Sequence, residues 1–191
     1  GKVIIFLGLF LLLPFAVALI YQEKSGIYFL ITAIISLVVG LLLSYKKPKD
    51  KRFYAREGFV VVALSWIVMS IIGACPFFFS GEIPSMVDAV FEIASGFTTT
   101  GASILTRVED LSQCMLFWRS FSHWIGGMGI LVFVLIFIPE SDDGSAMHLL
   151  RAESPGPQVG KLVSRMKATT GILYMIYFGL TIAEIFFLML D

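Results

Sequence analysis

The sequence predicts an all-α membrane protein with five transmembrane helices and one short re-entrant helix that is followed by an extended loop. Hydrophobic residues make up 58% of the chain and charged residues 15%, whereas soluble domains usually carry about a quarter charged residues. The mean hydropathy is +0.90. Several apolar runs reach the length of about 20 residues that a helix needs to cross a bilayer.

The first two apolar runs, residues 3–21 and 27–45, predict a helical hairpin that turns through a short polar segment. Pro14 lies inside the first run, and proline is tolerated in transmembrane helices, usually with a kink. A signal peptide is the alternative, but the run is too long for one and no small-residue cleavage site follows it. We therefore assign residues 1–45 to an N-terminal transmembrane hairpin.

A basic segment follows the hairpin. Residues 46–56 contain six Lys or Arg side chains in eleven positions. Because an excess of Lys and Arg beside a membrane segment marks the cytoplasmic side, we expect residues 46–58 to form a cytoplasmic loop and the N-terminus to be cytoplasmic. A polybasic patch that binds lipid headgroups is a second interpretation of the same residues.

Three further apolar runs complete the predicted topology. Residues 59–79 run outward, residues 116–138 return to the cytoplasm, and residues 171–190 run outward again. The polar segment 139–170 has the charge expected of a second cytoplasmic loop. With this arrangement, 11 of the 14 Lys and Arg side chains lie on the cytoplasmic side, in agreement with the positive-inside rule. The fifth run contains one acidic residue, Glu184, to which the sequence gives no role.

The stretch between the third and fourth runs is too short and too polar to cross a bilayer. Residues 87–95 have the apolar spacing of a helix. Residues 96–103 hold three threonines and two glycines, which favour an extended or turning backbone. A short helix followed by such a segment suits a cation filter, in which backbone carbonyl oxygens replace the water shell of the ion. On spacing alone, an ordinary outer loop with a threonine-rich turn fits equally well.

Four sequence landmarks resemble one known family. Phe-Thr-Thr-Thr-Gly-Ala-Ser at residues 97–103 resembles the first filter segment of the Trk/Ktr/HKT superfamily of potassium transporters. Three other stretches are similar to the bacterial Trk-type membrane subunit. They are Arg-Glu-Gly-Phe at 56–59, Trp-Ile-Gly-Gly-Met-Gly-Ile at 124–130 and Ala-Glu-Ser-Pro-Gly-Pro-Gln at 152–158.

The resemblance implies an organisation in repeats. In that superfamily, four helix–loop–helix repeats of one long chain surround a single pore. This chain would then hold one complete repeat, residues 59–138, with a re-entrant pore helix and an extended filter loop. Residues 171–191 would be the first helix of a second repeat. The chain therefore resembles the N-terminal part of a longer subunit.

The resemblance also implies a function. It is potassium transport across the bacterial inner membrane, with potassium as the permeant ion and no cofactor in this chain. Its expected partners are the lipid bilayer, the remaining repeats, a second copy of the subunit in a homodimer, and a cytoplasmic ring protein that binds nucleotide. Alternatives are a non-conducting membrane scaffold and a relative that also passes sodium. No catalytic constellation suggests an enzyme, and no basic patch interleaved with aromatic residues suggests nucleic acid.

The candidate ion ligands are Thr99, Thr100, Gly101 and Ala102, through carbonyl oxygens directed at the pore axis. Potassium is expected at the first three of these residues. Glycine permits backbone dihedrals that other residues resist. The short helix would point its carbonyl end, which carries partial negative charge, toward the cation path.

Charged residues near the loop are candidates for its support. Glu92 and Arg119 lie at membrane depth, where charged side chains usually have a partner or face a polar cavity. Asp88 precedes Glu92 by four residues and shares its helix face. We therefore expect Glu92 to be buried and hydrogen-bonded behind the loop. Arg119 is its first expected partner, and amide groups of the loop are the second.

Several other residues have two interpretations. Gly126, Gly127 and Gly129 indicate either a hinge or, as we favour, close helix packing. His123 is expected to be a hydrogen-bonded packing residue rather than a metal ligand. Cys75 and Cys114 could form a disulfide near the outer ends of their helices, although free buried thiols are favoured.

Overall fold

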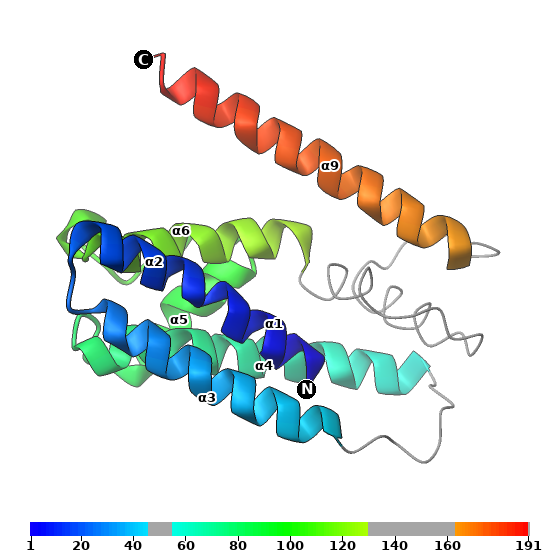
Figure 1. Cartoon of the computed structure of the whole chain (residues 1–191), viewed down its shortest axis with the longest axis horizontal. Helices are drawn as coiled ribbons and strands as arrows, with labels where there is room; N and C mark the ends of the chain where they lie inside the picture. Colours follow the sequence, from blue (N-terminus) through cyan, green and yellow to red (C-terminus); the bar gives the residue numbers. More distant parts are fainter. Residues whose placement is uncertain (46–54, 130–162, 191) are drawn as a thin grey trace. The chain divides into compact units, whose positions relative to one another are not determined.

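The computed structural model describes residues 1–45, 55–129 and 163–190, and within these residues it is helical and contains no strand (Figure 1). The described residues form two units. One contains residues 1–45 and 60–127, and the other contains residues 55–59, 128–129 and 163–190. Four stretches of these helices are long and apolar enough to cross a membrane, and the chain is an all-helical membrane protein. They are Lys2–Tyr21, Gly26–Tyr45, Phe59–Ser80 and Thr170–Leu188.

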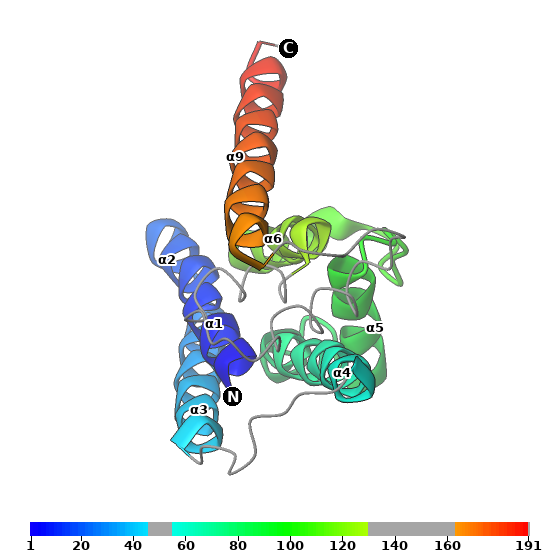
Figure 2. The same ribbon diagram turned by 90° about the vertical axis from the view of Figure 1, so that its right-hand side faces the viewer.

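The N-terminal hairpin contains α1 (Lys2–Phe10), α2 (Leu12–Tyr21) and α3 (Gly26–Tyr45). The first predicted helix is divided at Leu11, three residues before Pro14. Proline has no N–H to donate to the carbonyl four residues earlier, and its ring crowds that carbonyl. Leu11 keeps right-handed helical dihedrals, so the interruption is local. Figure 2 shows α1, α2 and α3 together on one side of the unit, with α4 and α5 on the other.

The predicted repeat begins with α4 (Ala55–Ser80), which contains Pro76 in its last turns. Residues 55–58 were predicted to belong to a loop and are helical instead. The short helix α5 (Met86–Phe97) is longer than the predicted 87–95, since Gly96 and Phe97 also have helical conformation. A single 3₁₀ turn follows at Val108–Asp110, stabilised by an exposed ion pair of 2.9 Å between Arg107 and Asp110.

Two helices were predicted with different boundaries. Helix α6 (Gln113–Met128) starts three residues before the predicted 116, and it ends where Gly129 takes a left-handed φ of +63°. Helix α9 (Val163–Leu188) starts eight residues before the predicted 171, inside the segment expected to be a loop. The remainder of the fourth predicted span, residues 130–138, and the predicted loop residues 46–54 and 139–162 lie outside the described residues. The predicted division of the chain into hairpin, loops and repeats therefore stays a prediction.

The centre of the first unit is an aromatic cluster around Trp118 of α6, which is fully buried. Its ring packs edge-on against Phe29 of α3 and Phe97 of α5, with centroid distances of 6.2 Å in both cases. Its indole N–H donates to the carbonyl of Gly73 in α4, at 2.9 Å. One side chain thus joins four helices and satisfies its own polar group, as buried tryptophans require.

Glycines allow the helices of this unit to approach closely. A Cβ on Gly96 of α5 would overlap the hydroxyl of Ser122, and a Cβ on Gly126 of α6 would overlap the carbonyl of Phe97. A Cβ on Gly73 would lie 3.0 Å from the side chain of Ile93. Because small residues let helix backbones come together in membranes, these contacts fix α5 against both α4 and α6.

Candidate functional site

The candidate site is built on α5, whose start is fixed by a side-chain cap. The hydroxyl of Ser85 accepts a hydrogen bond of 3.3 Å from the N–H of Asp88. Serine is a favoured residue at this position because it satisfies one of the free N–H groups of the first turn. Asp88 lies in that turn, where a negative charge is favourable near the helix N-terminus.

The loop that follows α5 satisfies the carbonyl groups at the C-terminal end of the helix. The N–H groups of Thr98, Thr99 and Thr100 donate to the carbonyls of Ala94, Gly96 and Ser95, each at 2.9 Å. The Thr98 hydroxyl adds a bond of 2.7 Å to Ala94. The last carbonyls of a helix need such partners. The chain therefore turns back over the end of α5 before it leaves the helix.

The sequence predicted an extended loop at residues 99–102, and this prediction is wrong at two of these residues. Thr99 has a φ of +55° and Gly101 a φ of +75°. A Cβ on Gly101 would meet nothing within 4 Å, so space does not demand a glycine there. Its backbone conformation does, because side-chain-bearing residues rarely adopt the left-handed region. Thr98, Thr99, Thr100, Gly101 and Ala102 are all exposed.

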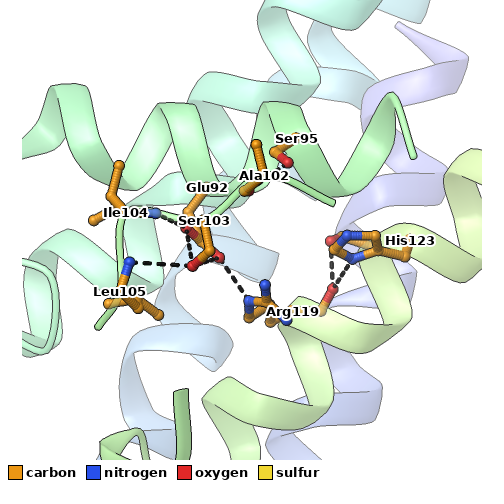
Figure 3. A network of polar contacts seen from close by, with 9 residues as sticks. Glu92, Ser95, Ala102, Ser103, Ile104, Leu105, Arg119 and His123 are labelled. Carbon is orange, nitrogen blue, oxygen red and sulfur yellow. Dashed lines mark hydrogen bonds and ion pairs between the residues drawn. The ribbon is translucent and has the colours of Figure 1, made fainter. Parts of the chain in front are cut away.

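Behind this loop lies Glu92, whose side chain is fully buried (Figure 3). Arg119 Nε of α6 donates to Glu92 Oε1 at 2.6 Å. On the loop side, the Ser103 hydroxyl lies 3.0 and 3.1 Å from the two carboxylate oxygens, and the Ile104 N–H donates at 3.1 Å. The Leu105 N–H donates in turn to the Ser103 hydroxyl at 3.1 Å. Both partners expected from the sequence, Arg119 and the loop amides, contact the same carboxylate.

Ser95, one turn beyond Glu92 on the same face of α5, makes a second contact with the loop. Its hydroxyl donates to the carbonyl oxygen of Ala102 at 2.6 Å, and the residue is 6% exposed. Glu92 and Ser95 thus hold three consecutive residues of the returning chain (Figure 3). Ser95 was not among the residues predicted from the sequence, although its spacing of three from Glu92 places both residues on one helix face.

Helix α6 presents one face to α5. Arg119 on that face binds Glu92, and its own carbonyl accepts from the Ser122 hydroxyl at 2.6 Å. His123 Nδ1 lies 3.0 Å from the same carbonyl, so this nitrogen carries the proton (Figure 3). Gly126, two turns from Arg119, packs on the end of α5. Among the three glycines expected to permit packing or hinge motion, Gly126 is at a close contact and Gly129 is at a helix end, while Gly127 is exposed.

A second group of carboxylates, which was not predicted from the sequence, lies at the start of α6. Glu82 accepts from the Ser112 N–H at 2.8 Å, from the Ser112 hydroxyl at 2.7 Å and from the Ser25 hydroxyl at 2.9 Å. Glu23 accepts from the N–H groups of Gln113 and Cys114, at 2.7 and 2.9 Å. The free N–H groups at this helix start are thus satisfied from two separate turns of the chain.

The pKa of Glu23 reflects this position. Burial raises the pKa of the carboxyl group, but the N–H groups of Cys114 and Gln113 stabilise the anion more strongly. As a result the pKa is lowered from its ordinary value of 4.5. Glu23 therefore remains charged at physiological pH and keeps its place on the helix start.

Other candidate chemistries have little support in the part of the chain that the structure describes. There, no cluster of His, Cys, Asp and Glu has the composition of a metal site. Cys75 and Cys114 are free thiols, as favoured from the sequence, but only Cys114 is buried and Cys75 is partly exposed. Glu184 lies on an exposed part of α9, and its role stays open.

Comparison with known proteins gives consistent results. The family model TrkH, described as a cation transport protein, matches residues 25–190. The chain is 41% identical over 185 residues to the Trk system potassium uptake protein TrkH of Escherichia coli strain K12, which covers 95% of the chain and 38% of that relative. The Trk system potassium uptake protein TrkG of the same strain is 36% identical over 179 residues, which cover 92% of the chain and 37% of the relative.

A solved structure is also similar. The potassium transporter TrkH from Vibrio parahaemolyticus matches with a TM-score of 0.70 and 32% sequence identity, covering 95% of this chain and 38% of that one. The chain thus spans less than two fifths of the length of these relatives.

Proposed function

Because the chain belongs to the TrkH family of cation transport proteins, we propose that it supplies the first pore-forming repeat of a subunit that transports potassium across a membrane. The relatives named as potassium uptake proteins support the choice of ion. Their greater length supports a subunit in which further repeats complete the pore. A pore of four repeats needs the rest of that subunit, so the function belongs to the complete protein.

The loop after α5 is the proposed filter. The single observation that carries this proposal is the loop geometry: an exposed threonine–glycine turn with left-handed φ values at Thr99 and Gly101 is fixed from behind by a buried carboxylate. Backbone carbonyl groups on the exposed side of such a turn would replace the water shell of a cation. The proposed potassium ligands are carbonyls of Thr99, Thr100 and Gly101, with Ala102 as the fourth candidate.

Glu92 is proposed to brace this filter rather than to bind the permeating ion. Its carboxylate is already occupied by Arg119, by the Ser103 hydroxyl and by the Ile104 N–H. A buried carboxylate that accepts several hydrogen bonds has no free oxygen to offer a passing cation. It can, however, hold the returning chain at a fixed distance from α5. Asp88 is proposed to assist from the first turn of the helix, where its charge is favourable.

The membrane setting follows the charge pattern. We place the protein in the bacterial inner membrane with its N-terminus and the basic segment 46–58 in the cytoplasm. Partners in this proposal are lipid, the remaining repeats, a second subunit and a cytoplasmic nucleotide-binding ring protein. A cysteine introduced at position 49 of the complete subunit should resist an impermeant thiol reagent applied to intact cells. Labelling from outside would overturn the topology.

The filter proposal is tested with Gly101→Ser in the complete subunit. Serine strains the left-handed backbone at this position, so the carbonyl groups beside it should lose their geometry. We expect the ratio of potassium to sodium uptake in cells or proteoliposomes to fall. Gly81→Ser is the matched control, because Gly81 also has a positive φ, of +80°, with open space around it, but lies in the loop before α5. An unchanged uptake ratio in Gly101→Ser would reject the filter assignment.

A further inference from the structure

Ser95 contacts both arms of the Gly101 turn. Its backbone carbonyl accepts from the Thr100 N–H at 2.9 Å, and its hydroxyl donates to the Ala102 carbonyl at 2.6 Å. The residues immediately before and after Gly101 are therefore tied to one residue of α5. Gly101 itself lies between these two residues, with open space where a Cβ would be.

The Ser95 hydroxyl also determines where the Ala102 carbonyl points. A hydrogen bond of 2.6 Å requires the oxygen to face the donor, and Ser95 is 6% exposed on the inner face of α5. The Ala102 oxygen is thus directed back toward the helix. A cation that approached this oxygen would meet the positive end of the hydroxyl dipole, which occupies one of its two lone-pair directions.

We propose that Ser95 is a positioning residue that turns the Ala102 carbonyl away from the ion path and so ends the coordinating segment at Gly101. This inference rests on the proposed filter function, and it narrows the four candidate ligands to Thr99, Thr100 and Gly101. It differs from the bracing role of Glu92, which holds Ser103 and Ile104 but makes no contact with the carbonyl of a candidate ligand.

The consequence concerns ion preference more than stability. Without the hydroxyl, the Ala102 carbonyl loses its donor and is free to rotate toward the exposed side of the loop. One more ligand of variable position would then be available to an ion of either size. Selectivity among cations depends on the number and placement of the coordinating carbonyl dipoles, so the preference for potassium over sodium should change.

The test uses the complete subunit in proteoliposomes, with potassium uptake measured alone and in competition with sodium. Ser95→Ala should reduce the preference for potassium by about fivefold, the change that about 1 kcal/mol produces at 1.4 kcal/mol per factor of ten. Ser95→Thr keeps the hydroxyl and should keep the parent protein's preference for potassium. Ser36→Ala is the matched control, since Ser36 is 2% exposed and its hydroxyl donates to the Thr32 carbonyl at 2.7 Å, inside α3. It should leave the preference unchanged.

The outcomes separate the inference from the proposed function. If Gly101→Ser alters the uptake ratio and Ser95→Ala does not, the role of Ser95 is rejected and the filter stands. If neither substitution alters the ratio, the filter assignment fails and the inference fails with it. A change in Ser36→Ala equal to that in Ser95→Ala would also reject the role of Ser95, because loss of any buried hydroxyl would then suffice.

A second measurement needs no substitution. The carbonyl of Ala102 or of Gly101 can be labelled with heavy carbon and oxygen in the unaltered subunit, and its infrared band recorded in potassium and then in sodium. The Gly101 band should shift on ion exchange, and the Ala102 band should not. An Ala102 band that shifts as far as the Gly101 band would overturn the inference, even if the Ser95 variants do not fold.

Discussion

Three glutamates of the first unit hold loops against helices, and Glu92 does so in different surroundings from Glu23 and Glu82. Glu92 is fully buried and balances its charge with Arg119, whereas Glu23 and Glu82 are partly exposed and bind N–H groups at the start of α6. The Arg119 side chain is 18% exposed, so that ion pair is shielded from water on most sides. For Glu23 and Glu82, the partial positive charge at the start of α6 balances the carboxylate charge in place of an arginine.

The difference in burial determines how much stability is lost when a carboxylate loses its partner. In a buried position, a carboxylate is expensive unless several groups compensate it, and removal of one member leaves the other uncompensated. At a partly exposed helix start, water replaces whatever partner is lost. We therefore expect the three glutamates to differ in how far their replacement destabilises the protein, with Glu92 first, Glu82 second and Glu23 last.

The largest effect is predicted for Glu92→Gln in the complete subunit. Glutamine has nearly the same shape but no charge, so Arg119 would keep a largely buried positive charge without its counterion. Breaking a buried ion pair in this way costs about 3–5 kcal/mol. The free energy of unfolding, measured by denaturant titration in detergent, should fall by about that amount, and potassium uptake should fall with it.

The control for this prediction is Glu109→Gln, which removes a charge from an exposed residue of the 3₁₀ turn. Exposed substitutions usually change stability by about 0.5 kcal/mol or less. If the two variants have the same stability and uptake, Glu92 does not brace the loop. The combination of Glu92→Gln with Arg119→Met should recover part of the loss, because the second substitution removes the arginine charge that the first leaves without a counterion.

The role of Glu92 and Arg119 was predicted from the sequence, whereas that of Glu23 and Glu82 was not. A charge inside an apolar run is visible in the sequence, since it costs about 2.5–3.5 kcal/mol at membrane depth and so demands a partner. Glu23 and Glu82 fall in polar turns, where acidic residues are ordinary. Their partners are 90 and 30 residues away along the chain, and only the path of the folded chain brings them together.

The helix boundaries show a similar division. Apolar runs located the helices, but their ends depend on contacts that periodicity does not contain. Helix α5 extends through Gly96 and Phe97 because N–H groups of the following threonines satisfy its last carbonyls. Glycine has a low helix propensity, so the sequence argued for an earlier end. Helix α9 starts at Val163 among charged residues that were taken to mark a loop.

A smaller effect is predicted for Glu82→Ala. This carboxylate accepts three hydrogen bonds, two from Ser112 and one from Ser25, and so joins the turn after α2 to the start of α6. Hydrogen bonds to charged groups contribute about 1.5–3 kcal/mol each when buried, but partial exposure lets water replace them. We expect a loss of about 1–2 kcal/mol in the free energy of unfolding. A loss as large as that of Glu92→Gln would remove the distinction between the two groups.

The smallest effect is predicted for Glu23, and it should depend on pH. The folded-state pKa of Glu23 is lowered from 4.5, so its contribution is fully present above about pH 4.5 and is lost as the pH falls through the lower folded-state value. Because solvent screens this group, the contribution is about 1 kcal/mol or less. The difference in thermal stability between the parent protein and Glu23→Gln should be present at pH 7 and should shrink below pH 4.5. Glu82 faces the same helix start, but it is common to both proteins, so its contribution cancels in the difference. A difference that stays constant from pH 7 to pH 3 would show that the Glu23 charge does not stabilise the start of α6.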